Sequence, residues 1–289
     1  MENRSPGYAL SSGFIFCRSC SGLAIRLACD ILSGQTITNG ACQIMNEQWI
    51  NKKVAFLGDS ITDKIHVGTE KNYWEYLAES CRIIPLVYGI NGQRWISVRS
   101  QAEKLLAEHG SDVDAIFVFI GTNDYNGSVP PGEWFVLREE ENNFNGVMRK
   151  KMRRHFNMDT STLRGSINAG MSFLKKHFPV QQIILLTPIH RGFACFSAEN
   201  VQPEESFPNL LDLYTETYIN CIKEAGNIWS VPVIDLNAVC GLFPMMDEYA
   251  QYFHDPETDR LHPNAAGHRR IAEVLKYQMQ MFPSSFKGN

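Results

Sequence analysis

The stretch Lys53-Val-Ala-Phe-Leu-Gly-Asp-Ser60 carries four consecutive apolar residues directly before a Gly-Asp-Ser turn. A continuous apolar run without polar alternation is typical of a strand covered on both faces. Comparable runs occur at 84–88, 115–120, 182–187 and 231–235. Amphipathic helical patterns occur near 72–81, 95–108, 162–177, 207–226 and 264–281. This alternation predicts one α/β domain, a three-layer α/β/α sandwich around a parallel sheet of about five strands.

The residues directly after the strands are mostly small, polar or titratable. In a parallel sheet the carboxyl ends of all strands lie at one edge, and ligands bind in the crevice there. We therefore expect the functional site at this edge. Its segments are 58–60, 89–92, 121–124, 188–191 and the end of a long loop at 259–262.

The composition of the 289-residue chain excludes several protein classes. Hydrophobic residues make up 44% and the formal net charge is −4, as in ordinary globular proteins. Because a basic surplus is missing, we do not expect nucleic-acid binding. Eight Cys in this length do not form a disulfide framework and favour a reducing compartment. The most apolar N-terminal run, residues 23–32, contains Arg26 and Asp30, so we expect neither a transmembrane segment nor a signal peptide, and a cytoplasmic location.

Residues 1–44 differ from the rest of the chain. They are rich in Ser, Gly and Thr, contain half of the Cys and show no sustained apolar period. We expect a poorly ordered N-terminal extension over 1–44, followed by the folded domain at 45–289, with an insertion at about 126–164.

Ser60 is a candidate nucleophile, because it follows a buried strand at an expected strand-to-helix turn, where a helix N-terminus offers free N–H groups. A hydroxyl nucleophile needs a base and a group that orients the base. His262 and Asp259, three residues apart, can fill these roles, and Pro263-Asn264 then begins the last helix. Attack on an acyl carbonyl also needs donors for the oxyanion. The candidates are the backbone N–H groups of Ser60 and Gly92 and the side-chain amide of Asn123.

These segments together resemble the SGNH/GDSL hydrolases. Gly58-Asp59-Ser60-Ile61 is similar to the first block of that family, Gly92 to the second, Gly121-Thr122-Asn123-Asp124 to the third and Asp259-x-x-His262-Pro263 to the last. The resemblance covers roughly 53–282. It implies a flavodoxin-like sheet and metal-free hydrolysis of esters through an acyl-enzyme on Ser60. Members of the family act on many acyl substrates, so the resemblance does not identify the substrate.

The insertion holds Trp134, an acidic run at 139–141 and a basic run at 149–154. Two interpretations stay open. It is a lid or platform in which Trp134 contacts the substrate, or a solvated helical excursion pinned by its aromatic residues. Further candidate substrate contacts are Asp59, Asp124, His190 and Arg191, although His190 and Arg191 are equally well explained as a strand-end cap.

We expect a serine esterase that removes short acyl groups, such as acetyl, from a carbohydrate or a small molecule. A lysophospholipase or thioesterase is the nearest alternative, and a carbohydrate-binding module without turnover is another. We expect no cofactor, because no nucleotide-binding glycine motif is present, and no metal. Weaker metal candidates are the thiols Cys17, Cys20, Cys29 and Cys42, and the group His254, Asp255, Asp259 and His262. The oligomeric state is left open.

Overall fold

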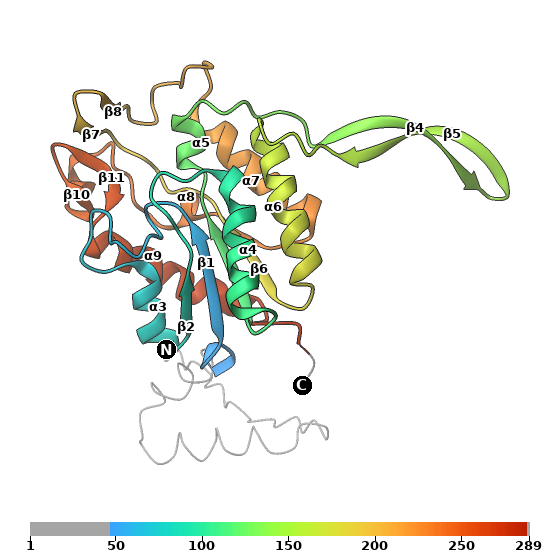
Figure 1. Ribbon diagram of the computed structural model, residues 1–289. Helices are drawn as coiled ribbons and strands as arrows, with labels where there is room; N and C mark the ends of the chain where they lie inside the picture. Colours follow the sequence, from blue (N-terminus) through green and yellow to red (C-terminus); the bar gives the residue numbers. More distant parts are fainter. Residues whose placement is uncertain (1–46, 288–289) are drawn as a thin grey trace, which may run out of the picture. The chain divides into compact units, whose positions relative to one another are not determined.

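A five-stranded parallel sheet forms the centre of the computed structural model, which describes residues 47–287 (Figure 1). The expected extension at 1–44 lies outside the described residues. The strand order is β2-β1-β3-β6-β9, and every neighbouring pair is parallel. The strands are β1 (Lys53–Gly58), β2 (Ile84–Val87), β3 (Ala115–Phe119), β6 (Gln182–Leu186) and β9 (Val233–Ile234). The predicted sheet of about five strands is confirmed.

Alternation along each strand supplies both faces of the sheet with apolar side chains. In β1, Val54 and Phe56 join one hydrophobic cluster, whereas Ala55 and Leu57 join the other. The first cluster lies under α3 (Tyr73–Cys81) and α9 (Ala265–Gln278), and the second under α4 (Val98–His109), α6 (Leu163–His177) and α7 (Thr215–Trp229). The three-layer α/β/α sandwich is therefore confirmed. Helix α7 begins later than predicted, because residues 207–214 form turns.

The short elements were not predicted. The helical turns are η1 (Glu47–Trp49), η2 (Trp95–Ser97), α5 (Thr122–Asn126), α8 (Leu236–Val239), η3 (Asp247–Tyr252) and η4 (Met279–Met281). A second small sheet has the order β10-β11-β7-β8 and consists of β7 (Ala194–Ser197), β8 (Asn200–Gln202), β10 (Phe253–Asp255) and β11 (Asp259–Pro263). No helix of the described residues is both long and apolar enough to span a bilayer.

The insertion contains a β-hairpin, so its interpretation as a helical excursion is wrong. Strands β4 (Phe135–Phe144) and β5 (Val147–Phe156) pair over ten residues each. Asn145 and Gly146 join them, both with positive φ (55° and 84°), which is the conformation of the tight hairpin turn that Asn-Gly favours. In Figure 1 the hairpin extends away from α6 and α7.

We expect a chain that starts at Met45 to unfold at the same denaturant concentration as the full chain, because it keeps every residue of the two hydrophobic clusters described above. Trp49 belongs to this core, and its indole N–H donates to the Met279 carbonyl (3.2 Å). In the shortened chain, Trp49→Ala should therefore cost about 3–5 kcal/mol in the free energy of unfolding. Equilibrium denaturation of both proteins is the measurement. An unfolded Met45 chain would show that residues 1–44 belong to the fold.

Candidate active site

Ser60 lies in a turn at the carboxyl end of β1. The N–H of Thr62 donates to the Asp59 carbonyl (3.1 Å), and the N–H of Asp63 donates to the Ser60 carbonyl (3.3 Å). The next helix, α3, begins only at Tyr73. The helix predicted near 72–81 is confirmed, but its N-terminus lies thirteen residues after Ser60, so the expected free N–H groups of a helix start are not at this hydroxyl.

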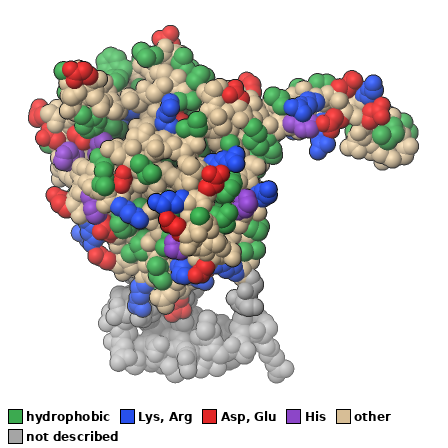
Figure 2. Space-filling view, in the orientation of Figure 1, with side chains coloured by type: hydrophobic (Ala, Val, Ile, Leu, Met, Phe, Trp, Pro, Cys, Tyr) green, Lys and Arg blue, Asp and Glu red, His purple; other side chains and the backbone are tan. Residues whose placement is uncertain are grey.

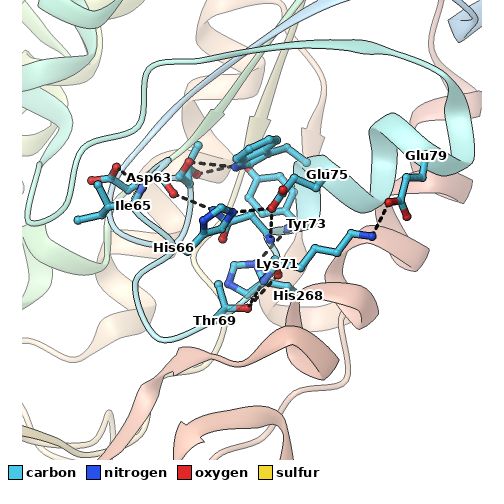
Figure 3. Close-up of polar contacts among 12 residues, drawn as sticks. Asp63, Ile65, His66, Thr69, Lys71, Tyr73, Glu75, Glu79 and His268 are labelled. Atoms are coloured by element: carbon cyan, nitrogen blue, oxygen red, sulfur yellow. Dashed lines mark hydrogen bonds and ion pairs between the residues drawn. The ribbon is translucent and has the colours of Figure 1, made fainter.

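Side-chain hydrogen bonds fix the loop between Ser60 and α3 (Figure 3). The Asp63 carboxylate accepts from the N–H of Ile65 (3.1 Å), and one oxygen of Glu75 contacts His66 Nε2 and the N–H of Asn72, each at 2.7 Å. These bonds replace the helical hydrogen bonds that the loop lacks. The loop also brings Gly68 so close to His262 that a Cβ at position 68 would lie 2.8 Å from the Cβ of His262.

His262 connects Ser60 to Asp259. Its Nε2 lies 3.0 Å from Ser60 Oγ, and its Nδ1 lies 2.9 Å from Asp259 Oδ2. Asp259 Oδ1 accepts from the backbone N–H groups of Leu261 (3.1 Å) and His262 (3.0 Å). Ser60, Asp259 and His262 are each no more than 5% exposed. The structure thus brings the three predicted residues together as a buried hydroxyl–imidazole–carboxylate chain.

Strand β11 presents His262 to the sheet edge. It pairs with β10 on one side and with β7 on the other. Directly after it, the Asn264 side chain accepts from the N–H groups of Ala266 (3.0 Å) and Gly267 (3.1 Å) and so caps α9. The predicted start of the last helix at Pro263-Asn264 is confirmed, although Asp259 and His262 lie on a strand rather than on a turn.

The predicted oxyanion donors lie on three neighbouring strand ends. Gly92 follows β2, Ser60 follows β1 and Asn123 follows β3, and these strands are adjacent in the sheet. The backbone N–H groups of Ser60 and Gly92 have no acceptor among residues 47–287. Gly92 has a φ of +76°, and its Cα faces open space. Two donors thus remain available for a bound anion.

The loop that carries Gly92 is held at three points. The N–H of Asn91 donates to Asp63 Oδ2 (2.6 Å). The amide of Asn123 donates to the Gln93 carbonyl (3.0 Å), which leaves its second N–H for another acceptor. The N–H of Trp95 donates to the Asp124 carboxylate (3.1 Å). The position of the Gly92 N–H is therefore preorganised by the protein.

A protein-family profile matches most of this chain. The sequence profile of the GDSL-like lipase/acylhydrolase family matches residues 56–270. The chain belongs to this family. The match confirms the resemblance found in the sequence, and it makes the protein a member of a family of ester hydrolases. A comparison with curated proteins finds no match.

Solved structures share the fold of this GDSL-family protein. A protein from Lactobacillus plantarum is 25% identical with a TM-score of 0.61, and the alignment covers 80% of this chain and 98% of that one. A protein from Chitinophaga pinensis, described as a possible lipase, is 20% identical with a TM-score of 0.59, over 79% of this chain and 98% of that one. The second similarity shows the fold alone.

Asp59 and Asp124, expected as substrate contacts, are buried in this GDSL-family protein. Only 2% of Asp59 and 1% of Asp124 is exposed. Burial raises the pKa of each carboxyl to about 7. Asp59 accepts from the N–H of Ile61 (3.2 Å) and Asp124 from that of Trp95. Both carboxyls thus anchor the loops around the site, and their expected contact with the substrate stays a prediction.

Arg191 is also buried, with 1% of its surface exposed. Its guanidinium donates to the Thr122 carbonyl (3.2 Å) and to Gln202 (2.9 Å), and burial lowers its pKa to about 10. His190 pairs with Glu205 (2.5 Å), which raises the pKa of the imidazole. These contacts fit the strand-end cap, one of the two interpretations of His190 and Arg191 that the sequence left open.

Trp134 does not lie with the catalytic candidates. It is only 9% exposed, and its indole N–H donates to Glu224 on α7 (2.7 Å). The Arg164 guanidinium lies 5.6 Å from the ring centroid. Trp134 therefore joins the insertion to α7, and its expected contact with substrate is not supported.

Phe196 was missed by the sequence analysis. Its ring lies 5.5 Å from that of His262 and is 45% exposed. It belongs to β7, a four-residue strand that the apolar pattern did not reveal. An exposed aromatic side chain beside the imidazole forms a wall for a bound molecule.

The group His254, Asp255, Asp259 and His262 does not assemble as a metal centre. His254 Nδ1 lies 3.1 Å from the Gly68 carbonyl, and Asp255 accepts from the backbone of Glu257 and Thr258. Over residues 47–287, no three His, Cys, Asp or Glu side chains are grouped to hold a metal. The four N-terminal thiols lie outside the described residues.

We expect the free energy of unfolding of the unmodified protein to fall between about pH 5 and about pH 8, and we expect Asp124→Asn to make this fall smaller. Burial raises the pKa of Asp124 from the ordinary value of 3.8 to about 7 in the folded protein. Its contribution to the free energy of unfolding is therefore fully present below about pH 3.8 and is lost as the pH rises through about 7. Asparagine does not titrate and can still accept from Trp95. The free energy of unfolding at both pH values measures the effect.

The matched control is Asp112→Asn. Asp112 is exposed, and Lys53 lowers the pKa of its carboxyl, so it titrates below this pH window. The control should lose stability over the window as the unmodified protein does. An Asp124→Asn variant that does the same would contradict the assignment.

Proposed function

We propose that this GDSL-family protein is a serine esterase in which Ser60 is the nucleophile, His262 the general base and Asp259 the residue that orients the base. The observation that carries the proposal is the continuous chain of contacts from Ser60 Oγ to His262 Nε2 (3.0 Å) and from His262 Nδ1 to Asp259 Oδ2 (2.9 Å). These distances are those of a nucleophile activated by an adjacent base.

The reaction proceeds in two halves. His262 Nε2 takes the Ser60 proton while Oγ bonds to the acyl carbon, and the carbonyl oxygen becomes an oxyanion. The N–H groups of Ser60, Gly92 and Asn123 stabilise that charge. The bond to the leaving alkoxide then breaks, and His262 returns the proton to it. In the second half His262 takes a proton from a water molecule while the water oxygen bonds to the acyl carbon. The bond to Ser60 Oγ then breaks, His262 returns the proton to Oγ, and the acid leaves.

Asp259 fixes the tautomer of His262. Because its Oδ2 accepts from Nδ1–H, the lone pair of the neutral imidazole lies on Nε2, facing Ser60. The two backbone N–H groups that bind Asp259 Oδ1 hold the carboxylate in place. The carboxylate also stabilises the imidazolium that forms during attack.

The preferred substrate we propose is a short acyl ester, such as acetyl, on a carbohydrate. A cavity lined by Asp59, Thr122 and Leu261, the chain neighbours of Ser60, Asn123 and His262, has a volume of only about 10 Å³, room for about one water molecule. It therefore gives no space to a long acyl chain. Phe196 offers an exposed ring beside His262 on which a sugar can stack.

A lysophospholipase or thioesterase is the second candidate. Ile65 and Ile90 are 70% and 50% exposed. Ile65 donates its backbone N–H to Asp63, and Ile90 precedes Asn91, whose N–H also donates to Asp63. A long acyl chain could bury these two side chains on the surface rather than in a cavity.

We expect Ser60→Ala to lower kcat by about 10⁴-fold or more, because it removes the atom that forms the acyl-enzyme. Hydrolysis of 4-nitrophenyl acetate measures the loss. A fluorophosphonate probe should label the unmodified protein and not the variant. Ser100→Ala, on the exposed side of α4, is the control and should keep both activity and labelling.

Retained turnover in Ser60→Ala would show that the nucleophile is misassigned. An unmodified protein that binds carbohydrate but neither hydrolyses esters nor reacts with the probe would instead support the binding module.

We expect kcat/KM to fall by about tenfold or more from 4-nitrophenyl acetate to 4-nitrophenyl octanoate, because the cavity lined by Asp59, Thr122 and Leu261 has room for only about one water molecule. Steady-state kinetics over the acetyl, butyryl and octanoyl esters measures the trend. A higher value for octanoate would favour the lysophospholipase or thioesterase, and it would leave the role of Ser60 unchanged.

A further inference from the structure

The hairpin β4–β5 is a two-stranded ribbon that extends from the domain (Figure 1). Its ladder pairs Phe135 with Phe156 at the root and Phe144 with Val147 at the tip without a bulge. An isolated two-stranded ribbon is at best marginally stable in water. A ribbon of this length therefore needs a surface that covers one of its faces.

Alternation along the two strands gives the ribbon two unlike faces. The register of β4 and β5 assigns the cross-strand partners to the same face. We call the first the apolar face; it carries Phe135, Leu137, Glu139, Glu141, Asn143, Met148, Lys150, Met152, Arg154 and Phe156. We call the second the basic face; it carries Val136, Arg138, Glu140, Asn142, Phe144, Val147, Arg149, Lys151, Arg153 and His155.

The side-chain contacts agree with this division. Arg154 lies over the Phe135 ring, 4.9 Å from its centroid, on the apolar face. On the basic face, Arg153 donates to Glu140 (2.8 Å). Figure 2 shows basic, acidic and hydrophobic side chains interleaved along the hairpin.

The apolar face is covered only at its root. There the Phe156 ring stacks on Trp229 of α7, with centroids 4.2 Å apart. Further out, Leu137, Met148 and Met152 are 58%, 59% and 58% exposed. A groove of about 700 Å³, lined in part by Leu137 and Ile228, continues this open surface onto α7. The uncovered part of the face thus carries three exposed apolar side chains among charged ones and is continuous with the domain.

The charges on the apolar face are arranged for pairing with themselves. Glu139 and Glu141 lie on β4, whereas Lys150 and Arg154 lie on β5. A two-fold axis along the ribbon, between two stacked apolar faces, places β4 of one copy over β5 of the other. At equal distances from the root, Glu141 of one copy then faces Lys150 of the other, and Glu139 lies diagonally across from Lys150 and Arg154. Within one copy Glu139 lies 3.9 Å from Lys150, so the same charges pair within a copy or between copies, and the face is complementary to itself.

We propose that the β4–β5 hairpin is a dimerisation arm whose apolar face packs against the apolar face of the same arm in a second copy of this chain. The contact buries Leu137, Met148 and Met152 and brings Glu139 and Glu141 to Lys150 and Arg154 of the partner. The basic face, with four Arg or Lys and a single carboxylate, stays in solvent. A polyanion bound to the basic face would leave the apolar face exposed, so a second copy is the occupant that accounts for both faces.

Two complementary charge reversals test the arm in the full-length protein. The variant E139K/E141K makes the charges of the apolar face all basic, and K150E/R154E makes them all acidic. Sedimentation velocity should show a dimer for the unmodified chain and self-association weakened by about tenfold or more for each variant. An equimolar mixture of the two variants should restore the dimer, now as a heterodimer that a tag on one variant recovers.

The matched control is R138E/R149E, which reverses two charges on the basic face and should leave the dimer intact. Activity toward 4-nitrophenyl acetate and the thermal midpoint report whether each variant folds. A monomeric unmodified chain, a dimer insensitive to both reversals or a mixture that stays monomeric would overturn the proposal. So would a monomer that binds heparin or anionic vesicles through Arg138 and Arg149.

Discussion

The hydrogen bond between Ser60 Oγ and His262 Nε2 joins positions 202 residues apart, and the proposed chemistry depends on it. Its two ends are set by different parts of the fold. Ser60 is placed by the carboxyl end of β1, a buried strand in the middle of the sheet. His262 is placed by β11, which belongs to the small second sheet. Both sheets must therefore fold before the proton can pass from the hydroxyl to the imidazole. The loop after Ser60 must also pass so close to His262 that a Cβ at position 68 would clash with the Cβ of His262.

The surroundings of this bond consist of buried polar groups that hold backbone rather than substrate. Asp63, Asn123 and Asp124 bind the two sides of the loop that carries Gly92. Burying a charged carboxylate costs free energy, and this cost raises the pKa of Asp124 to about 7. The buried groups hold this loop in place, so the free N–H of Gly92 does not have to reorganise when charge develops on the substrate. That is the condition under which a hydrogen-bond donor lowers an activation barrier most.

Much of this arrangement could be predicted from the sequence, because it depends on local patterns. The apolar runs located the five parallel strands, and the polar residues after them located Ser60, Asn123 and His262. The roles of Asp59, Asp124 and Arg191 could not be predicted, since a polar residue at a strand end has the same local pattern whether it faces solvent or the interior. Strand β7, which carries Phe196, could not be predicted either. Four residues are too few to show an apolar period, and β7 is a strand because it pairs with β11 and β8. The hairpin itself has a local sequence signal, because Asn145-Gly146 is a dipeptide that favours a two-residue hairpin turn.

The hairpin can be long because its root is closed independently of the sheet. Asn168 on α6 donates to the carbonyls of both Trp134 and Asn157 at 2.9 Å, and its Oδ1 accepts from the Trp229 indole at 3.1 Å. One buried amide thus clamps the two ends of the ribbon and ties them to α6 and α7. Beyond the clamp, Phe135 still packs against the hydrophobic cluster that contains Ala55 and Leu57 of β1. The side chains further out are constrained by whatever the ribbon meets outside the domain. This separation explains how an alternating pattern of Leu, Met, Glu and Lys can persist on a surface without disturbing the site around Ser60.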